Sequence, residues 1–143
     1  MSKMLEEIRQ QPETLERSLA SGLRAAERLR KELNRRRPKL IVLAARGTSD
    51  HAGIYARYLI ETTFGWPVGL AASSVTTVYG ARIDWRDVLL IAISQSGAGP
   101  DIAAVAEAAH LGGATTVALT NEPDSPIAAI ADGVTTGGMG KEA

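Results

Sequence analysis

The chain has 143 residues, of which 45% are hydrophobic, 22% charged and 4% aromatic, and it contains no cysteine. This length suits one domain with a real hydrophobic core, and the composition excludes a disordered tail, a collagen, a disulfide scaffold, thiol catalysis and Cys-ligated zinc. No apolar run reaches the roughly 20 residues that a membrane span needs, and the charged amino terminus has no signal-peptide core. We therefore expect a soluble, cytoplasmic protein.

The formal net charge of zero conceals an asymmetry between the two ends of the chain. Residues 1–39 carry 11 Lys and Arg against 6 Asp and Glu, whereas residues 40–143 carry 5 against 10. The basic excess lies between Arg28 and Lys39, where it fits a nucleic-acid contact or, preferably, a solvated helix end whose cations complement the helix dipole. Because no aromatic residue for base stacking is interleaved and no recognition-helix pattern follows, we expect no nucleic-acid partner.

Residues 1–37 have the apolar spacing of a helical segment. Pro12 suits the first turn of a helix, so the pattern predicts a break near Gln11 and a second helix that Pro38 ends. An apolar stripe at spacings of three and four runs along the segment. It packs on this chain's own sheet, which is the preferred interpretation, or on the helix of a partner. The stripe comprises Leu5, Ile8, Leu15, Leu19, Leu23, Ala26, Leu29 or Arg30, and Leu33.

From Lys39 onward, short apolar runs alternate with helical segments. Runs of this kind without polar alternation are typical of strands buried on both faces. Their alternation with helices predicts a single α/β domain over residues 38–143, with a doubly wound, parallel sheet of about five strands and helices on both faces. We expect strands at 40–45, 67–71, 88–93, 116–119 and 133–136, and helices at about 50–64, 100–111 and 125–131.

Two turns rich in hydroxyl groups follow the first and third predicted strands, and each leads into a helix. They are Arg46-Gly47-Thr48-Ser49-Asp50-His51 and Ser94-Gln95-Ser96-Gly97-Ala98-Gly99-Pro100. Hydroxyls, free backbone N–H groups and a helix amino terminus can hold a phosphate without a metal. In a flavodoxin-like sheet of order 2-1-3-4-5 the two strands are neighbours, so their turns face each other across the crevice at the switch point. The sequence therefore predicts an anionic ligand there, although such residues are also common in ordinary turns and helix caps.

These two turns resemble those of the sugar isomerase (SIS) domain. The similarity covers Ala45 to Gly53 and Ile93 to Gly97, and it extends to Met4–Pro12, Ala71–Ser74 and Ala114–Asn121, so it spans nearly the whole chain. More narrowly, the chain is similar to the isomerase part of glucosamine-6-phosphate synthase and to its isomerase and deaminase relatives without the glutaminase domain. The resemblance implies a phosphosugar-binding domain of an aldose–ketose isomerase. Its expected ligand is a hexose 6-phosphate, either fructose 6-phosphate or glucosamine 6-phosphate.

The resemblance also implies roles for individual residues. Arg46 stands where the synthases carry a cysteine, and Gly99 stands where they carry a threonine that adds a phosphate hydroxyl. The Gly-Lys-Glu sequence at 140–142 resembles a Gly-x-Glu motif of the family, which places Glu142 near the sugar end of the pocket as the candidate catalytic residue. The residues expected to form the phosphate site are Gly47, Thr48, Ser49, Ser94, Gln95, Ser96, Gly97 and Gly99.

The relatives carry two SIS domains in tandem. The resemblance implies that this chain lacks the helix that closes the first domain and the whole second domain, which supplies the general base. We therefore expect phosphosugar binding without robust isomerisation, with a non-catalytic sensing or regulatory module as the alternative. The apolar surface that a missing helix would leave uncovered predicts a homodimer or larger assembly.

We expect neither a metal nor a cofactor. His51 and His110 are the only histidines, and they lie on separate predicted helices without a third ligand at metal spacing. They are more simply explained as surface residues. Gly97-Ala98-Gly99 matches only part of a dinucleotide-binding turn, because Ile102 stands where the third glycine belongs.

Overall fold

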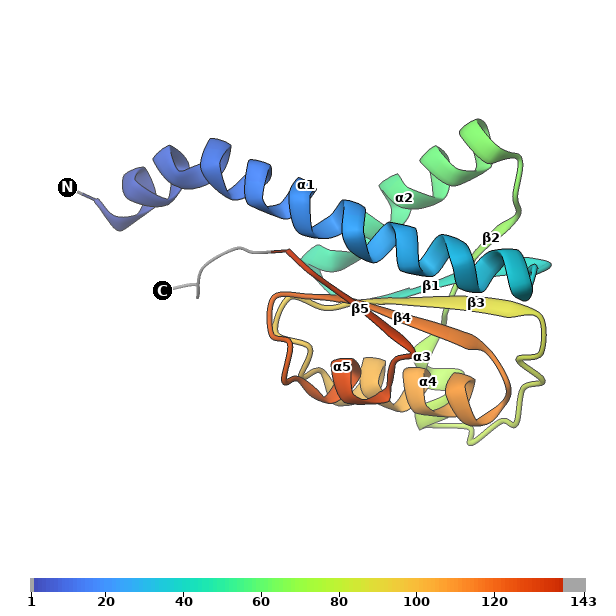
Figure 1. The fold of residues 1–143 in the computed structure, drawn as a ribbon. Helices are drawn as coiled ribbons and strands as arrows, with labels where there is room; N and C mark the ends of the chain where they lie inside the picture. Colours follow the sequence, from blue (N-terminus) through green and yellow to red (C-terminus); the bar gives the residue numbers. More distant parts are fainter. Residues whose placement is uncertain (1, 138–143) are drawn as a thin grey trace.

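A computed structural model describes residues 2–137 as a five-stranded sheet with helices on both faces (Figure 1). Its strand order is β2-β1-β3-β4-β5 and every neighbouring pair is parallel, which confirms the predicted doubly wound α/β class. In chain order the elements are α1 (Lys3–Arg35), β1 (Leu40–Ala45), α2 (Thr48–Phe64), β2 (Val68–Leu70), α3 (Ser73–Thr77), β3 (Val88–Ile93), α4 (Pro100–Leu111), β4 (Thr115–Thr120), α5 (Pro126–Ile130) and β5 (Gly133–Thr136).

The central strands are apolar throughout because helices cover both faces of the sheet. We call the face of the sheet under α1 and α2 the upper face and the face over α4 and α5 the lower face, each with its own core cluster. Successive side chains of a strand point to opposite faces, so Ile41 and Leu43 of β1 join the upper cluster while Val42 and Ala44 join the lower one. β1 pairs with β3 over the full length of both strands, from Leu40 opposite Val88 to Ala45 opposite Ile93. Both strands therefore end at the same level, where the two hydroxyl-rich turns begin.

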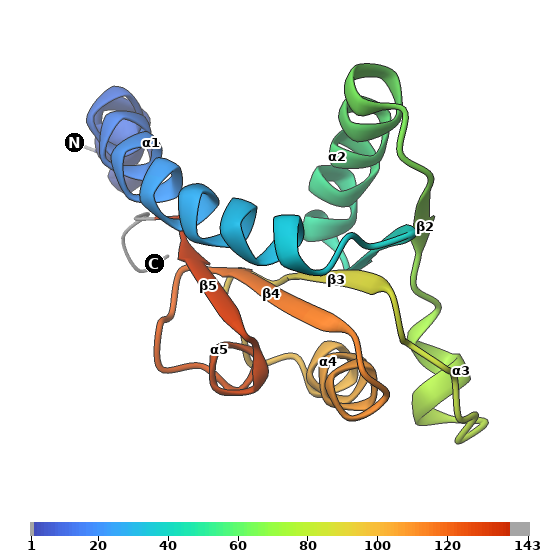
Figure 2. The same cartoon turned by 45° about the vertical axis from the view of Figure 1, so that its right-hand side comes forward.

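The lower face of the sheet is tightly covered. Figure 2 shows α4 and α5 beneath the sheet, with α3 beside them under the β2 edge. Ile102 and Val105 of α4 and Ile127 of α5 are at most 3% exposed, and they pack with Leu90 of β3 in one cluster. Because α4 follows β3 directly, this packing holds the amino terminus of α4 at the carboxyl edge of the sheet. The sequence did not predict α3, which is only five residues long.

The upper face is covered more loosely by α1 and α2, which diverge from each other in Figure 2. α1 has no buried residue, and the single buried residue of α2 is Gly53. Leu29 and Leu33 of α1 are only partly buried where they pack against the upper cluster. The helices on this face therefore leave apolar side chains in contact with solvent.

The predicted break near Gln11 is wrong, because α1 runs without interruption through Pro12. A proline inside a helix removes one N–H donor and so frees the carbonyl four residues earlier, here that of Ile8. In α1 the side chains around this point are exposed, Ile8 at 49%, so water can satisfy the freed carbonyl. Although α1 has 33 residues, no helix within residues 2–137 is both long and apolar enough to cross a membrane.

Only the carboxyl-terminal part of the apolar stripe of α1 packs on this chain's own sheet. Leu15, Leu19 and Leu23 are 63%, 65% and 70% exposed, so the preferred interpretation is wrong for this part of the stripe. A neighbouring face of the helix turns inward instead. There the Ser18 hydroxyl donates a hydrogen bond to the carbonyl of Gly137, just beyond β5. The exposed leucines form a separate surface beside that contact.

Candidate functional site

The first hydroxyl turn places two free side-chain hydroxyls at the amino terminus of α2. Gly47 directly precedes α2 and has a φ of +62°, which glycine adopts without strain. The turn closes with a hydrogen bond of 3.1 Å from the N–H of Asp50 to the carbonyl of Gly47. Thr48 and Ser49 are the first two residues of the helix, and neither hydroxyl has a hydrogen-bond partner among the residues that the structure describes. Both remain available to a ligand.

The second hydroxyl turn folds around its own serines. The N–H of Gly97 lies 3.2 Å from Ser94 Oγ, and the N–H of Ala98 lies 3.3 Å from Ser96 Oγ. Each hydroxyl accepts a bond from the backbone in this way, but it keeps its own proton to donate. Gln95 and Ser96 are exposed, whereas Gly97 is buried with a φ of +62°. The two serines can thus hold the turn in shape and still donate to an anion.

Residues at the end of β4 and just after it anchor this second turn from behind. The carbonyl of Gln95 accepts hydrogen bonds from Thr120 Oγ1 at 3.1 Å and from the N–H of Asn121 at 2.9 Å. The carbonyl of Gly97 accepts one from the N–H of Ile127 at 3.2 Å. β4 adjoins β3 in the sheet, so these groups stand at the same edge as the turn. Their contacts position the turn without touching the crevice in front of it.

Gly97 cannot be replaced without disturbing this anchor. A Cβ at this position would overlap the side chain of Ser125 and would lie 2.8 Å from Thr120 Oγ1. Ser125 is 5% exposed, and neither its hydroxyl nor the buried Oδ1 of Asn121 has a hydrogen-bond partner within residues 2–137. The sequence did not identify Thr120, Asn121 or Ser125 as part of the site, although their position at the end of β4 and just after it could have suggested it.

An ion pair links the two turns across the crevice. Arg46 follows β1 directly, and its Nη1 lies 2.8 Å from Oδ2 of Asp101 in the first turn of α4. Gly99 caps α4 with an ordinary φ of −61°, and Pro100 is the first helical residue. The amino termini of α2 and α4 therefore meet at the ends of adjacent strands. The partial positive charge of each helix terminus favours an anion between them.

A comparison with known families agrees with this arrangement. The family model described as the SIS domain matches residues 36–139, which is well over half of the chain. The chain belongs to the SIS domain family. The matched segment contains the whole sheet and both hydroxyl turns.

Curated relatives of this SIS domain are long enzymes. It is 36% identical over 135 residues to glutamine–fructose-6-phosphate aminotransferase (isomerizing) of Halobacterium salinarum, covering 90% of this chain but 22% of the relative. The enzyme of the same name from Symbiobacterium thermophilum is 35% identical over 138 residues, with 92% and 22% covered. The chain thus spans about a fifth of the length of these relatives.

Solved structures show the same fold. A candidate phosphosugar isomerase from Silicibacter pomeroyi matches with a TM-score of 0.90 and 38% identity over 95% of this chain and 42% of that one. The C-terminal domain of glucosamine-fructose-6-phosphate aminotransferase from Francisella tularensis matches with a TM-score of 0.81 and 28% identity, covering 97% and 40%. The NanR protein of Vibrio vulnificus, solved with ManNAc-6P, shares the fold at 16% identity and a TM-score of 0.73 over 91% of this chain and 49% of that one.

One predicted site residue cannot be placed. Glu142, with the rest of the Gly-Lys-Glu sequence, lies outside the described residues. The two histidines are exposed, as expected, and His110 Nδ1 lies 3.7 Å from Asp132. Within residues 2–137 no group of three or more His, Asp or Glu side chains is arranged to hold a metal ion.

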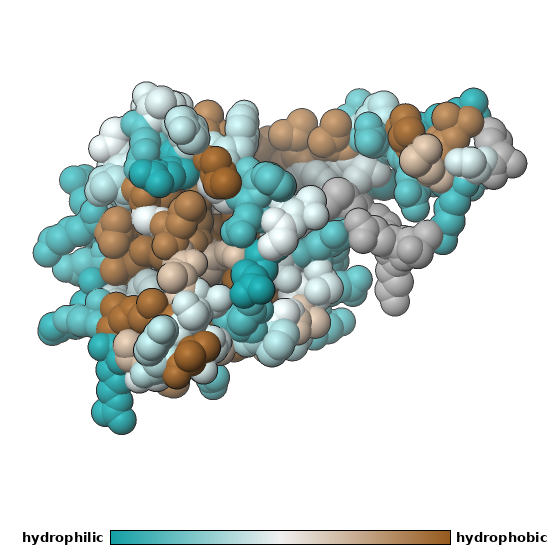
Figure 3. Space-filling model, turned by 180° about the vertical axis from the view of Figure 1, so that it is seen from behind, coloured by the Kyte–Doolittle hydropathy of each residue, from teal (hydrophilic) through white to brown (hydrophobic). Residues whose placement is uncertain are grey.

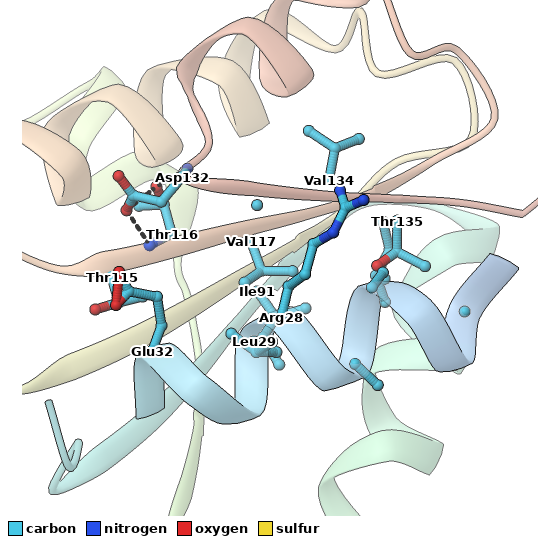
Figure 4. A pocket seen from close by; sticks show the side chains of 15 residues that line it. Arg28, Leu29, Glu32, Ile91, Thr115, Thr116, Val117, Asp132, Val134 and Thr135 are labelled. Carbon is cyan, nitrogen blue, oxygen red and sulfur yellow. Dashed lines mark hydrogen bonds between the residues drawn. The ribbon is translucent and has the colours of Figure 1, made fainter. Parts of the chain in front are cut away.

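A cavity lies away from the two hydroxyl turns. It has a volume of about 570 Å³ and opens between α1 and the upper side of β4 and β5 (Figure 4). Its polar lining includes the carboxylates of Glu32 and Asp132, and Oδ2 of Asp132 already accepts bonds from the N–H and hydroxyl of Thr116 at 2.8 and 3.0 Å. Arg28 also lines this cavity, so its charged lining is mixed, whereas the two turns offer hydroxyls and helix amino termini to an anion.

Proposed function

We propose that this SIS domain binds a hexose 6-phosphate, such as fructose 6-phosphate or glucosamine 6-phosphate, between its two hydroxyl turns. The observation that carries the proposal is the register of β1 with β3, which ends both strands at the same level, at Ala45 and Ile93. The turn with Thr48 and Ser49 and the turn with Ser94 and Ser96 therefore begin side by side. Both groups stand beside helix amino termini, where a phosphate is favoured. The names of the related aminotransferases and of the Silicibacter protein support a sugar phosphate as the ligand class.

The proposal is tested by calorimetric titration with glucosamine 6-phosphate, fructose 6-phosphate and unphosphorylated glucosamine. We expect binding only to the two phosphates. A hydrogen bond to a charged group contributes about 1.5–3 kcal/mol, so Ser96→Ala should weaken the affinity by about 10- to 100-fold. Ser21→Ala is the matched control, because its hydroxyl bonds only the carbonyl of Ser18 on α1. Binding that does not require the phosphate would contradict the proposal.

We further propose that residues 1–143 alone bind the sugar phosphate without robust isomerisation. Aldose–ketose isomerisation needs a base within hydrogen-bond reach of the transferred proton. The resemblance to the synthase family implies that the second SIS domain supplies this base. This chain matches 22% of the length of such a relative. Asp101, a carboxylate at the crevice, is already paired with Arg46. Rapid turnover by the purified chain would contradict the proposal.

A non-catalytic sensing module would bind the same ligand, so binding alone does not distinguish it from an enzyme fragment. The distinguishing measurement adds to the purified chain the part of the Francisella aminotransferase domain that this chain does not match, and follows isomerisation. Turnover above that of either part alone indicates an enzyme fragment. Unchanged turnover with intact binding favours the sensing module.

We also propose that the chain forms a homodimer or larger assembly. Tyr55, Tyr58 and Phe64 of α2 are 70%, 68% and 67% exposed, in addition to the leucines of α1. Figure 3 shows apolar side chains gathered over the body of the molecule and along the long helix. Exposed apolar patches of this kind commonly mark protein interfaces. Light scattering over a concentration series tests the proposal, and a monomer at every concentration would contradict it.

A further inference from the structure

The ion pair between Arg46 and Asp101 leaves most of the guanidinium unused. Nη1 of Arg46 makes a single contact with Asp101 Oδ2 at 2.8 Å, and within residues 2–137 no other partner of this side chain is described. A guanidinium has five N–H donors in a planar fork, so most of them remain for another acceptor. The side chain of Arg46 is also 65% exposed, which leaves it room to turn.

Asp101, in contrast, is held in place by its own helix. Its Oδ1 accepts a hydrogen bond of 3.0 Å from the N–H of Ile102, and its side chain is 28% exposed. A carboxylate in the first turn of a helix is also stabilised by the helix dipole. If the pair separates, Arg46 is therefore the partner that moves, and Asp101 keeps its place.

The pair lies where a phosphate would have to enter. Arg46 directly precedes Gly47 of the first turn, and Asp101 follows Gly99 of the second by two residues. A phosphate monoester carries a charge of about −1.5 to −2 at neutral pH, so it competes with the single carboxylate for the guanidinium. Phosphate oxygens can also accept two parallel N–H bonds from the fork, whereas Asp101 contacts only one nitrogen of the guanidinium here.

We infer that Arg46 is a phosphate-binding residue that Asp101 holds across the crevice until the ligand's phosphate displaces the carboxylate. The inference rests on the proposed function and adds to it a cation at a position where the synthases carry a cysteine. Asp101 acts as the competitor in the ligand-free state. It also repels the bound phosphate, so its charge opposes binding in both ways.

The test uses calorimetric titration of glucosamine 6-phosphate into the full chain and its variants. Arg46→Ala should weaken the affinity by about 10- to 100-fold and reduce its dependence on salt, because a charged hydrogen bond is lost. The affinity of Arg46→Lys should lie between those of the wild type and Arg46→Ala, since lysine keeps the charge but loses the planar fork. Asp101→Asn should tighten binding by about two- to tenfold.

Arg57→Ala provides a matched control. Arg57 forms an exposed ion pair with Glu61 four residues later on α2, at 3.4 Å, so its replacement removes the same charge and a similar contact away from the crevice. We expect less than a twofold change in affinity. An equal loss in Arg46→Ala and Arg57→Ala would assign the effect to net charge and overturn the inference.

The remaining outcomes separate the inference from the proposed function. Binding that Ser96→Ala weakens but Arg46→Ala does not would overturn the inference and leave the proposed function intact. Weaker binding by Asp101→Asn would overturn the exchange of partners, because Asp101 would then be holding Arg46 in its binding position. An absence of binding by both the wild-type and the Asp101→Asn chains would overturn the proposed function and the inference with it.

Discussion

Two glycines with the same backbone angle allow the anchor behind the second turn to be measured. Gly47 and Gly97 both have a φ of +62°. A Cβ at Gly47 would meet nothing within 4 Å, whereas one at Gly97 would overlap Ser125 and lie 2.8 Å from Thr120 Oγ1. Gly47 has a ψ of −130°, outside the left-handed helical region, so Gly47→Ala should cost about 1–3 kcal/mol of backbone strain. Gly97→Ala combines strain at a positive φ with overpacking of about 1–3 kcal/mol, for a total of about 2–6 kcal/mol.

Urea unfolding followed by circular dichroism measures both costs. With a slope of about 2 kcal/mol per molar urea, a difference of about 2 kcal/mol between the variants lowers the midpoint of Gly97→Ala by about 1 M relative to Gly47→Ala. The total stability of a domain is about 5–15 kcal/mol, so both variants should still fold. Equal midpoints for the two variants would refute the argument, because the overlap behind the turn is expected at Gly97 alone.

A second substitution checks the cause of the difference. Ser125→Gly removes the Oγ and Cβ that a new side chain at position 97 would overlap. By itself this change should be nearly neutral, because the Ser125 hydroxyl is buried without a partner and glycine is tolerated as a helix cap. Combined with Gly97→Ala it should recover about half of the lost free energy. Strictly additive losses would show that the two positions do not interact.

Three further predictions concern the rest of the molecule. Leu19→Glu should leave the unfolding free energy within about 0.5 kcal/mol, because Leu19 is 65% exposed, yet it should lower the assembly state by light scattering if α1 is an interface. Asp132→Ala should cost about 1–3 kcal/mol in urea unfolding by orphaning the N–H and hydroxyl of Thr116, whereas Asp132→Asn should cost less because the amide oxygen still accepts. The Arg86 guanidinium holds the pKa of Asp84 at about 2, below its ordinary 3.8, so the stability this pair contributes is present above about pH 4 and is lost as the pH falls toward 2. Asp84→Asn should flatten the pH dependence of the unfolding free energy slightly over that window, and an unchanged acid limb would contradict the assignment.

The local pattern of apolar and turn residues was sufficient to predict the strands of the sheet and the position of the hydroxyl turns. The boundaries predicted for β1, β3 and β5 agree with the structure. β1 and β3 are continuous apolar runs, which are typical of parallel strands covered on both faces. The predicted order placed β1 beside β3 and hence the two turns at one edge, as the structure shows. The phosphate chemistry assigned to those turns remains a prediction.

Long-range contacts decided what the pattern could not. The helical spacing predicted an apolar stripe on α1, but it did not predict which face of the helix packs on the sheet. That face depends on where β5 and the upper cluster lie, so Leu19 is exposed to solvent while Ser18 contacts Gly137. Pro12 stays within the helix because solvent surrounds it, and a local rule for proline contains no such information.

The fold class and the two turns could be predicted from the amino-acid pattern, since apolar runs and turn residues are recognised among neighbours in the chain. The strand order came from the similarity to flavodoxin-like sheets, and the structure confirms it. Only the tertiary structure decided that Arg46 pairs with Asp101 and that Ser125 leaves no room for a side chain at Gly97. These residues are tens of positions apart, and they meet because parallel strands deliver their carboxyl ends to the same edge of the sheet. Contacts between such segments depend on the packing of the whole sheet, which no local spacing encodes.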